Sequence, residues 1–307
     1  MKAAQIRKFG DPSVVQIVDV STPEVKEGYV LVKVHAVSLN PFDTAMRIGS
    51  VPFELPATLG GDFAGVVEAV GPDVTNVAVG DKVYGQANIL GGNSGAFAEY
   101  ALTKADQIAK MPTTVSYVEA ASLVLVGVSA LQGLSEHINL RPGQKILIQG
   151  GSGGIGTVAI QIAKDAKAHV ATTVNGSVIG TIHALGADEI IDYETQNFEE
   201  VLDHDFDAVF DTVGGDTFLR SLNMLKPGGV AVSMIAQPEE TIAKEKGVQA
   251  MMQHTKVNAE RLQALCALID AGTVTPHVAQ TFPFARITDA FTIRETTSIT
   301  GKIVLEV

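Results

Sequence analysis

The pattern of apolar and polar residues changes near residue 116. Before it, short apolar segments separated by glycine and proline predict strands, and Tyr29–Ser38 (YVLVKVHAVS) alternates as a half-buried strand does. Asn40–Gly49 (NPFDTAMRIG) predicts a short helix. The other strands expected here lie before residue 10 and at 14–20, 55–70, 77–84 and 96–102. This part of the chain is therefore predicted to be a β-rich, barrel-like domain.

After residue 116 the period becomes helical, and strands then alternate with helices. Two helices are expected at 117–125 and 126–137, and later helices at 177–185, 218–225 and 259–271. Strands are expected at 145–149, 169–174, 189–191, 208–213 and 230–235. Such alternation builds a doubly wound parallel sheet, so the predicted fold class is α/β. Strand and turn signals return at the end of the chain, in GKIVLEV.

The stretch Lys145–Lys164 (KILIQGGSGGIGTVAIQIAK) joins a predicted strand to a predicted helix through five glycines in seven residues. Gly151, Gly153 and Gly156 satisfy the pattern G-x-G-x-x-G. Its glycines allow a tight turn, a close approach to a pyrophosphate, and close helix–strand packing. The helix N-terminus offers unpaired N–H groups to the anion. The predicted dinucleotide contacts are Gly151, Ser152, Gly153, Gly154, Ile155 and Gly156.

Composition and charge exclude several classes of function. The chain has 307 residues, with 22 Lys and Arg against 34 Asp and Glu, for a net charge of −12. Nucleic acid and anionic membrane are not expected partners, because both require clustered positive charge. The N-terminus lacks the apolar core of a signal peptide, and the apolar run Ala120–Leu134 falls short of the about 20 residues of a span. A cytoplasmic location is the default expectation. Cys266 is the one cysteine, so no disulfide or cysteine-based metal site is expected.

The order of motifs resembles the medium-chain dehydrogenase/reductase superfamily over nearly the whole chain. It is most similar to the zinc-independent quinone oxidoreductase and enone reductase branch. The motifs that carry the resemblance are NPFDTAMRIG, LGGDFAGVVEAVG, VGDKVYG, FAEYA, RPGQKILIQGGSGGIG, ALGADEIIDY, FDTVGG, LKPGG and GKIVL. The resemblance implies a GroES-like substrate domain (1–123 and 265–307), a Rossmann domain (124–264), and an active site in the cleft. It also suggests a homodimer.

The same resemblance indicates that no metal takes part. Zinc-dependent members use a first-domain Cys, a Gly-His-Glu segment and a later Cys or Asp. Here the Cys position falls at Asn40, the Gly-His-Glu position reads Gly60-Gly61-Asp62, and the Cys-rich lobe is missing. Zinc needs several N or S donors, and the seven histidines show no ligand spacing. Without a Lewis acid the favoured acceptors are quinones and α,β-unsaturated carbonyls, whose conjugation stabilises the charge that arrives with hydride.

NADPH is the expected cofactor, and NADH is the alternative. The second predicted strand of the nucleotide domain ends at Val174-Asn175 without the acid that holds the ribose hydroxyls in NAD-binding domains. In the family a Lys and a Tyr hold the 2′-phosphate. The Tyr corresponds to Tyr193, whereas Ser177 and Val178 occupy the neighbourhood of the Lys. The predicted hydrogen-bond donors to this phosphate are Thr173, Asn175, Ser177 and Tyr193; Tyr193 could also be a strand-end aromatic that covers the sheet.

Further candidates lie where the resemblance places the nicotinamide. Asn40 is the predicted catalytic residue, and its amide could orient the carboxamide or the acceptor oxygen; otherwise it is a turn residue before Pro41. The other predicted cofactor contacts are Ser129, Val213 and Ile235, and Ser129 could equally be a small residue within a helix. Asp43 and Arg47, four apart, are expected to form an ion pair. Tyr84 is expected to be a packed strand residue rather than a proton donor.

These observations predict an NADPH-dependent, metal-independent reductase of quinones or enones. No residue is required as a general acid, so solvent could protonate the product, and catalysis would depend on positioning. The alternative is an NADPH-binding redox sensor or structural protein without significant turnover.

Overall fold

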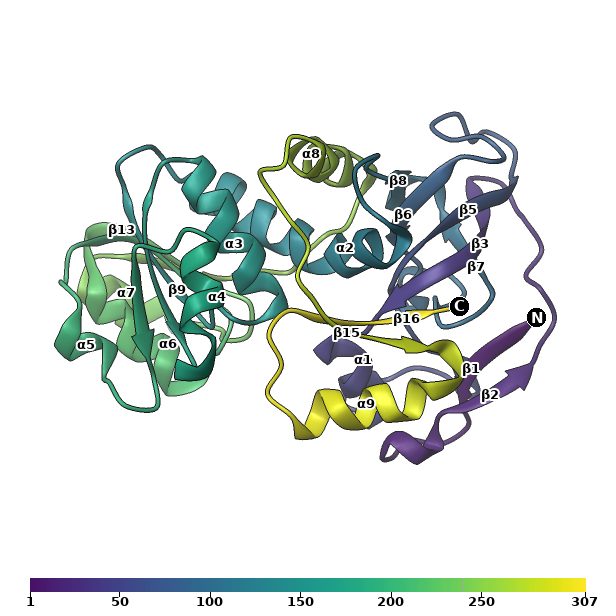
Figure 1. Cartoon of the computed structure of the whole chain (residues 1–307), viewed down its shortest axis with the longest axis horizontal. Helices are drawn as coiled ribbons and strands as arrows, with labels where there is room; N and C mark the ends of the chain where they lie inside the picture. The colour runs from purple at the N-terminus through teal and green to yellow at the C-terminus, as the bar shows by residue number, and fades with distance from the viewer. Residues whose placement is uncertain (239) are drawn as a thin grey trace. The chain divides into compact units, whose positions relative to one another are not determined.

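The computed structural model describes residues 1–238 and 240–307 and has the predicted α/β fold. It divides into two compact units. Unit 1 comprises residues 1–125, 257–271 and 276–307, and unit 2 comprises 126–256 and 272–275. The sequence-based domain boundaries lie at 123/124 and 264/265. In Figure 1 the purple N-terminal strands and the yellow C-terminal strands belong to the same unit.

Unit 1 is rich in antiparallel strands. One sheet has the order β2-β1-β4, and a seven-stranded sheet has the order β15-β16-β3-β5-β6-β8 with β7 also paired to β3. The strands are β1 (Lys2–Ile6), β2 (Gln16–Asp19), β3 (Tyr29–Ser38), β4 (Ala57–Thr58), β5 (Asp62–Val70), β6 (Lys82–Gln86), β7 (Tyr100–Lys104), β8 (Ile108–Lys110), β15 (Val278–Pro283) and β16 (Lys302–Glu306). Its helices are α1 (Pro41–Arg47), the first part of α2 (Tyr117–Leu131), α8 (Ala259–Asp270) and α9 (Ile287–Thr296). The core gathers apolar side chains such as Phe63, Phe97 and Phe291.

The pairing of β16 with β3 brings the end of the chain to the start of α1. Val304 lies opposite Ser38, and Leu39 N donates to Ile303 O at 3.0 Å. Gly301, just before β16, has a φ of +83°, and a side chain there would overlap His277 O. Glycine is therefore required at the entry to β16. The pairing of β16 with β3 then places Lys302 next to Asn40.

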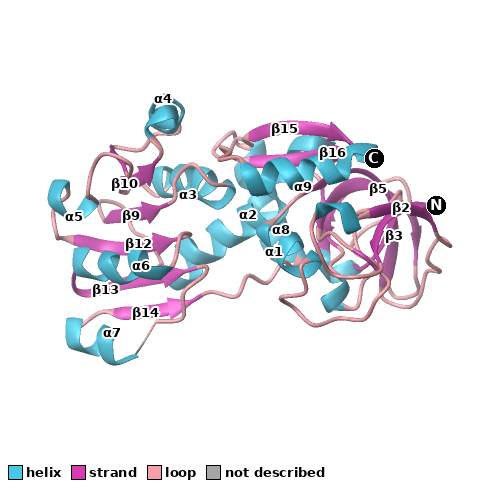
Figure 2. Cartoon of the chain, turned by 90° about the horizontal axis from the view of Figure 1, so that it is seen from below, coloured by secondary structure: helices cyan, strands magenta, loops and turns pink. Residues whose placement is uncertain are grey.

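Unit 2 contains one parallel sheet with the order β11-β10-β9-β12-β13-β14. The strands are β9 (Lys145–Gln149), β10 (His169–Val174), β11 (Glu189–Asp192), β12 (Phe206–Asp211), β13 (Leu225–Ser233) and β14 (Gln249–Met252). Figure 2 shows β10, β9, β12, β13 and β14 side by side. The helices are α3 (Gly154–Asp165), α4 (Ile179–Ala184), α5 (Phe198–Val201), α6 (Gly215–Ser221) and α7 (Glu240–Lys246). Strand order reverses between β9 and β12, which is where open α/β sheets bind ligands.

Several elements differ from the sequence-based prediction. Residues 117–137 form one helix, since α2 continues into a π-helical segment at Gln132–His137, and not two helices. The sequence pattern predicts no helix or strand in the stretch 239–256, yet it contains α7 and β14; residue 239 lies outside the described residues. Helix α9 was also not predicted, because its β-branched residues (ITDAFTIRET) resemble strand and turn signals.

The α2 helix is longer than the sequence pattern indicated. Among the described residues, Tyr117–His137 is the one helix with the length and apolar composition of a membrane span. However, 72% of the residues in its most apolar 18-residue stretch are buried inside the protein. Burial of this kind is what a core helix of a globular fold shows, and it gives no support to a membrane role.

Candidate functional site

The glycine loop, defined here as residues 150–156, connects β9 to α3 at the switch point of the sheet. Gly150 has a φ of +80°, so the tight turn is made by Gly150 and not by Gly151 as the motif suggested. Gly151 N donates to Thr173 O at 3.0 Å, and Gly153 N donates to Gly150 O at 3.1 Å. α3 begins at Gly154 with Gly153 as its N-cap, so the free N–H groups of the first helical turn lie in this loop.

The three motif glycines are needed for different reasons. A Cβ at Gly151 would overlap Thr172 Oγ1, and a Cβ at Gly156 would overlap Gly150 O, so packing alone requires glycine at both positions. A Cβ at Gly153 would meet only Gly150 O at 3.4 Å, an ordinary contact. The φ of Gly153 is −70°, which any residue adopts. Among the described residues nothing requires glycine at 153, whereas the approach of a phosphate to the loop backbone would require it.

The adenosine end of the predicted cofactor site contains fewer free donors than expected. Thr173 is buried and its hydroxyl donates to Gln149 Oε1 at 2.5 Å, so it points into the sheet. Ser177 Oγ donates to Asn175 Oδ1 at 2.6 Å, and Ser177 N donates to the same oxygen at 3.0 Å. Tyr193 is 56% exposed, and it follows β11 directly. The contacts of these four residues with the 2′-phosphate stay predictions. For Thr173 the hydrogen bond to Gln149 argues against such a contact, because it already uses the hydroxyl proton.

An acid that the sequence pattern did not reveal lies beside the turn that follows β10. Asp192 at the end of β11 is opposite Val174 at the end of β10. A Cβ at Gly176 would lie 2.5 Å from Asp192 Oδ2. The carboxylate also accepts hydrogen bonds from Glu194 N at 3.1 Å and Thr195 Oγ1 at 3.0 Å. β10 itself ends without an acid, as the sequence shows, but the neighbouring strand β11 places the Asp192 carboxylate next to the turn that follows β10.

The carboxyl edge of β12 and β13 is organised by a buried aspartate. Asp211 Oδ1 accepts from Val213 N at 3.0 Å, and Asp211 Oδ2 accepts from Ser233 Oγ at 2.6 Å. Ser233 Oγ in turn accepts from Ile235 N at 3.1 Å. These bonds fix the two turns and leave the Val213 and Ile235 side chains 48% and 59% exposed. This edge therefore presents apolar surface where the sequence predicts the nicotinamide.

Ser129, the remaining predicted cofactor contact of unit 2, is buried within α2. Its Oγ lies 2.8 Å from Thr255 Oγ1, just after β14. The structure thus places Ser129 in a hydrogen-bonded contact near the carboxyl end of the last strand.

In unit 1 Asn40 belongs to what we call the buried polar cluster, formed by Asn40, Asp43, Asp62 and Lys302. Asn40 Nδ2 donates to Asp62 Oδ2 at 2.8 Å, and Lys302 Nζ donates to Asn40 Oδ1 at 2.6 Å. Lys302 Nζ also donates to Leu39 O. Asn40 is 3% exposed and Lys302 is 5% exposed. The side-chain amide is thus held at its oxygen by a cation and at its nitrogen by a carboxylate.

The other contacts of the cluster keep its carboxylates supplied with donors. Asp62 also accepts from Ser38 Oγ at 3.3 Å, Gln86 Nε2 at 3.4 Å and Leu125 N at 3.2 Å. Asp43 Oδ2 accepts from Asn40 N at 2.8 Å, which fixes the first turn of α1. Several donors around one carboxylate favour its charged form and oppose the effect of burial.

Burial shifts the acid–base behaviour of the cluster. Desolvation raises the pKa of Asp43 to about 7, although the hydrogen bond from the Asn40 N–H opposes this rise. Burial also raises the pKa of Asp62, against the nearby Lys302 charge. Desolvation lowers the pKa of Lys302 to about 8, and the Asp62 and Asp43 carboxylates limit this fall. Perturbed groups packed together in this way are typical of functional sites.

Two further sequence-based expectations concern unit 1. Arg47 does not pair with Asp43; its guanidinium donates to Glu295 Oε1 at 2.6 Å and to Gly10 O, so the expected i,i+4 ion pair is replaced by a contact with α9. Tyr84 is fully buried and its hydroxyl donates to Leu262 O at 2.6 Å, as expected of a packed strand residue.

The residues at the zinc-ligand positions of the family do not fit a zinc ion. Asn40 and Asp62 stand at two of these positions, and the buried Lys302 ammonium is bound to Asn40. An amide, a carboxylate and a neighbouring cation provide none of the N or S donors that catalytic zinc uses. Within residues 1–238 and 240–307, no three His, Cys, Asp or Glu side chains are grouped as metal ligands.

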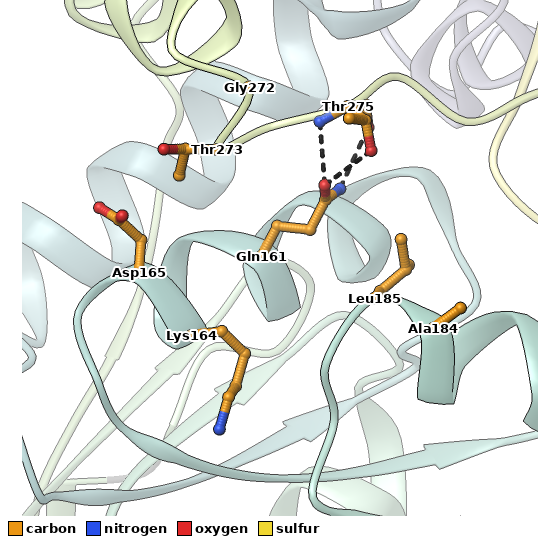
Figure 3. A pocket seen from close by; sticks show the side chains of 8 residues that line it. All are labelled: Gln161, Lys164, Asp165, Ala184, Leu185, Gly272, Thr273 and Thr275. Atoms are coloured by element: carbon orange, nitrogen blue, oxygen red, sulfur yellow. Dashed lines mark hydrogen bonds between the residues drawn. The ribbon is translucent and has the colours of Figure 1, made fainter.

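A separate surface pocket of about 360 Å³ lies in unit 2 at the C-terminal half of α3 (Figure 3). Two of its polar side chains, Gln161 and Lys164, are already engaged with the protein. Gln161 Oε1 accepts from Thr275 N and Thr275 Oγ1, both at 2.9 Å, and Lys164 pairs with Asp188 at 2.7 Å. The glycine loop is at the opposite end of the helix, so this pocket is not the nucleotide site.

Comparisons with known proteins agree with this architecture. Residues 26–113 match the family model "Alcohol dehydrogenase GroES-like domain", and residues 185–305 match "Zinc-binding dehydrogenase". A 2-methylene-furan-3-one reductase from Solanum lycopersicum is 34% identical over 317 residues, covering 99% of this chain and 79% of that protein.

Solved structures cover the whole chain. A quinone oxidoreductase from Coxiella burnetii has a TM-score of 0.91 at 36% identity, covering 100% of this chain and 99% of that one. The Escherichia coli quinone oxidoreductase complexed with NADPH also has a TM-score of 0.91, at 27% identity and with full coverage of both chains. The chain therefore belongs to the medium-chain dehydrogenase/reductase superfamily, in its branch of NAD(P)H-dependent quinone and enone oxidoreductases.

Proposed function

We propose that the protein is an NADPH-dependent reductase that delivers hydride, without a metal, to a quinone or an α,β-unsaturated carbonyl. The observation that carries this proposal is the geometry of Gly153. It is a glycine that packing does not require, at the N-terminus of a helix and at the switch point of a parallel sheet. A close backbone approach to a pyrophosphate explains it.

In this proposal unit 2 is the dinucleotide-binding domain. The glycine loop binds the pyrophosphate, and the turns after β12 and β13 place Val213 and Ile235 against the nicotinamide. The similar Escherichia coli enzyme binds NADPH, which supports the same cofactor here. Asp192 and the absence of a Lys near Ser177 weaken selection for the 2′-phosphate, so NADH is a poorer but usable substitute.

Unit 1 is the substrate domain in this proposal. Bound NADPH supplies hydride from its nicotinamide ring, and the negative charge that develops on the acceptor oxygen requires a hydrogen-bond donor. Asn40 is that donor, because its amide is buried and already oriented by its neighbours. The proton that completes the product comes from solvent.

The donor set at the zinc-ligand positions supports metal independence. The Lys302 ammonium repels a divalent cation beside Asn40, and the conjugated acceptor needs no Lewis acid to stabilise the charge it receives. The name of the Solanum relative denotes an enone reductase and that of the Coxiella structure a quinone reductase, which supports both acceptor classes.

The test is an acceptor panel of simple quinones and short enones, run with NADPH and with NADH. Loss of the reduced-nicotinamide absorbance with at least one acceptor, faster with NADPH, is the expected result. NADPH binding without oxidation by any acceptor would instead identify a cofactor-binding protein without turnover.

Location and assembly belong to the same proposal. The family membership and net charge of −12 fit an enzyme that acts in the cytoplasm on small molecules, without a nucleic-acid or membrane partner. A homodimer is the proposed assembly, and light scattering tests it.

A further inference from the structure

The GKIVL motif at the end of the chain contributes a buried charge for which the sequence offered no role. Lys302 starts β16, and its position is set by the Gly301 turn and by the pairing of β16 with β3. A lysine that is 5% exposed costs folding free energy unless its charge is compensated. Its ammonium donates to Leu39 O and to Asn40 Oδ1, with Asp62 and Asp43 close enough to interact electrostatically.

The charges on both sides of Asn40 determine which way its amide faces. Rotating the amide by half a turn would place its N–H groups against the Lys302 ammonium and its oxygen against the Asp62 carboxylate, and both contacts would be repulsive. Only one orientation therefore satisfies both neighbours. Asn40 Nδ2 has two N–H groups; one donates to Asp62, and within the described part of the chain the second has no acceptor.

We propose that Lys302 is a positioning residue, which together with Asp62 locks and polarises the Asn40 amide so that its second N–H can donate to the acceptor oxygen. This inference rests on the proposed function. An ammonium at the amide oxygen draws electron density toward that oxygen, and the N–H groups become stronger donors. The preorganised amide then costs no reorientation as charge develops on the acceptor.

The charged groups that face Lys302 come from three elements. Asp62 lies on β5, Asp43 lies on α1, and Arg294 lies on α9 beside Glu295. The two carboxylates favour the ammonium, whereas burial and the Arg294 charge disfavour it. Because the pKa of Lys302 is lowered to about 8, the ammonium is lost as the pH rises through that value. The proposal therefore expects kcat/KM for the acceptor to fall on the alkaline side.

The experiment is a double-mutant cycle between Lys302→Met and Asn40→Ala, measured as kcat and KM with NADPH and one acceptor. Lys302→Met is expected to lower kcat by roughly 10- to 100-fold with the NADPH Kd unchanged, since a preorganised donor is lost. In the Asn40→Ala background it should change kcat by less than about threefold, because the two residues act as one unit. Lys110→Met, an exposed lysine of the same unit paired with Asp81, is the matched control and should behave as the wild type.

The pH profile provides a readout that does not depend on the folding of the Lys302 variant. The wild type should show an alkaline decline near pH 8, and Asn40→Ala should lose that decline while keeping its residual activity. Equal fold-losses in both backgrounds, or an alkaline decline that persists in Asn40→Ala, would overturn the role of Lys302 and leave the proposed function standing. Absence of turnover in the wild type would overturn both.

Discussion

The glycine loop of unit 2 and the buried polar cluster of unit 1 reach precise geometry in opposite ways. The loop consists of seven consecutive residues and presents backbone groups, and its glycines remove side chains. The cluster joins side chains from residues 40, 43, 62 and 302, and it uses buried charges of both signs to fix one amide. A binding site for a common anionic cofactor can be local, whereas a group that must face one reacting atom needs support from distant parts of the chain.

The largest expected effect comes from a substitution in the glycine loop. Gly153→Ala should raise the NADPH Kd by about 100-fold, or about 2.7 kcal/mol, with little change in Tm, because the added Cβ would meet the ligand, whereas in the protein it makes only an ordinary contact with Gly150 O. Isothermal titration and thermal unfolding measure the two quantities. Gly151→Ala is the matched comparison and should lower Tm, since its Cβ would overlap Thr172 Oγ1. Equal loss of stability in both variants would contradict this division of roles.

The next largest effect comes from a substitution in the buried polar cluster. Asn40→Ala should lower kcat by about 100-fold, the usual consequence of losing one preorganised hydrogen-bond donor, and leave the NADPH Kd within about twofold. Steady-state kinetics and titration with NADPH are sufficient. A loss that appears only in the NADPH Kd would reassign Asn40 from the acceptor to the cofactor.

These two halves also differ in how far the sequence predicted them. The loop was identified from adjacent residues, since the strand, the glycines and the helix follow one another, although the turn itself uses Gly150. Asn40 was found through family resemblance, but Lys302 was not, because a lysine at the start of a strand normally faces water. Asp192 was missed for a different reason: it is 17 residues from Asn175 in sequence and approaches the turn after β10 only across the sheet.

The dependence of the protein's stability on pH tests the raised pKa of Asp43. The pKa of Asp43 is raised from 3.8 to about 7, so between these values the folded protein binds more protons than the unfolded chain. Its contribution to stability is therefore present at low pH and is lost as the pH rises toward 7. Asp43→Asn removes this titration, and its Tm relative to the wild type should improve between about pH 5 and 7.5 by the equivalent of about 2–3 kcal/mol. A constant difference across that range would exclude the raised pKa.

A smaller effect concerns the adenosine end of unit 2. Ser177 is exposed and stands where the family carries a Lys, so Ser177→Lys should tighten NADPH binding by about tenfold and leave the NADH Kd unchanged. Ser177→Gln, of similar length without charge, is the control. Equal tightening of both cofactors would show that the added side chain does not reach the 2′-phosphate.

The smallest effect tests whether Tyr84 is only structural. Tyr84→Phe removes the hydrogen bond to Leu262 O and should destabilise the protein by about 1 kcal/mol with kcat unchanged. Denaturant unfolding and steady-state kinetics provide the comparison. A fall in kcat with wild-type stability would make Tyr84 a participant in proton transfer.

The most direct test of the whole account is NADPH oxidation by protein whose metal content has been measured after chelation. The account predicts that the metal-depleted enzyme reduces a quinone or an enone at the rate of the untreated enzyme, because Asn40 and its charged neighbours stabilise the acceptor. The account would be contradicted if removal of bound zinc abolished the activity and added zinc restored it in proportion to the zinc bound.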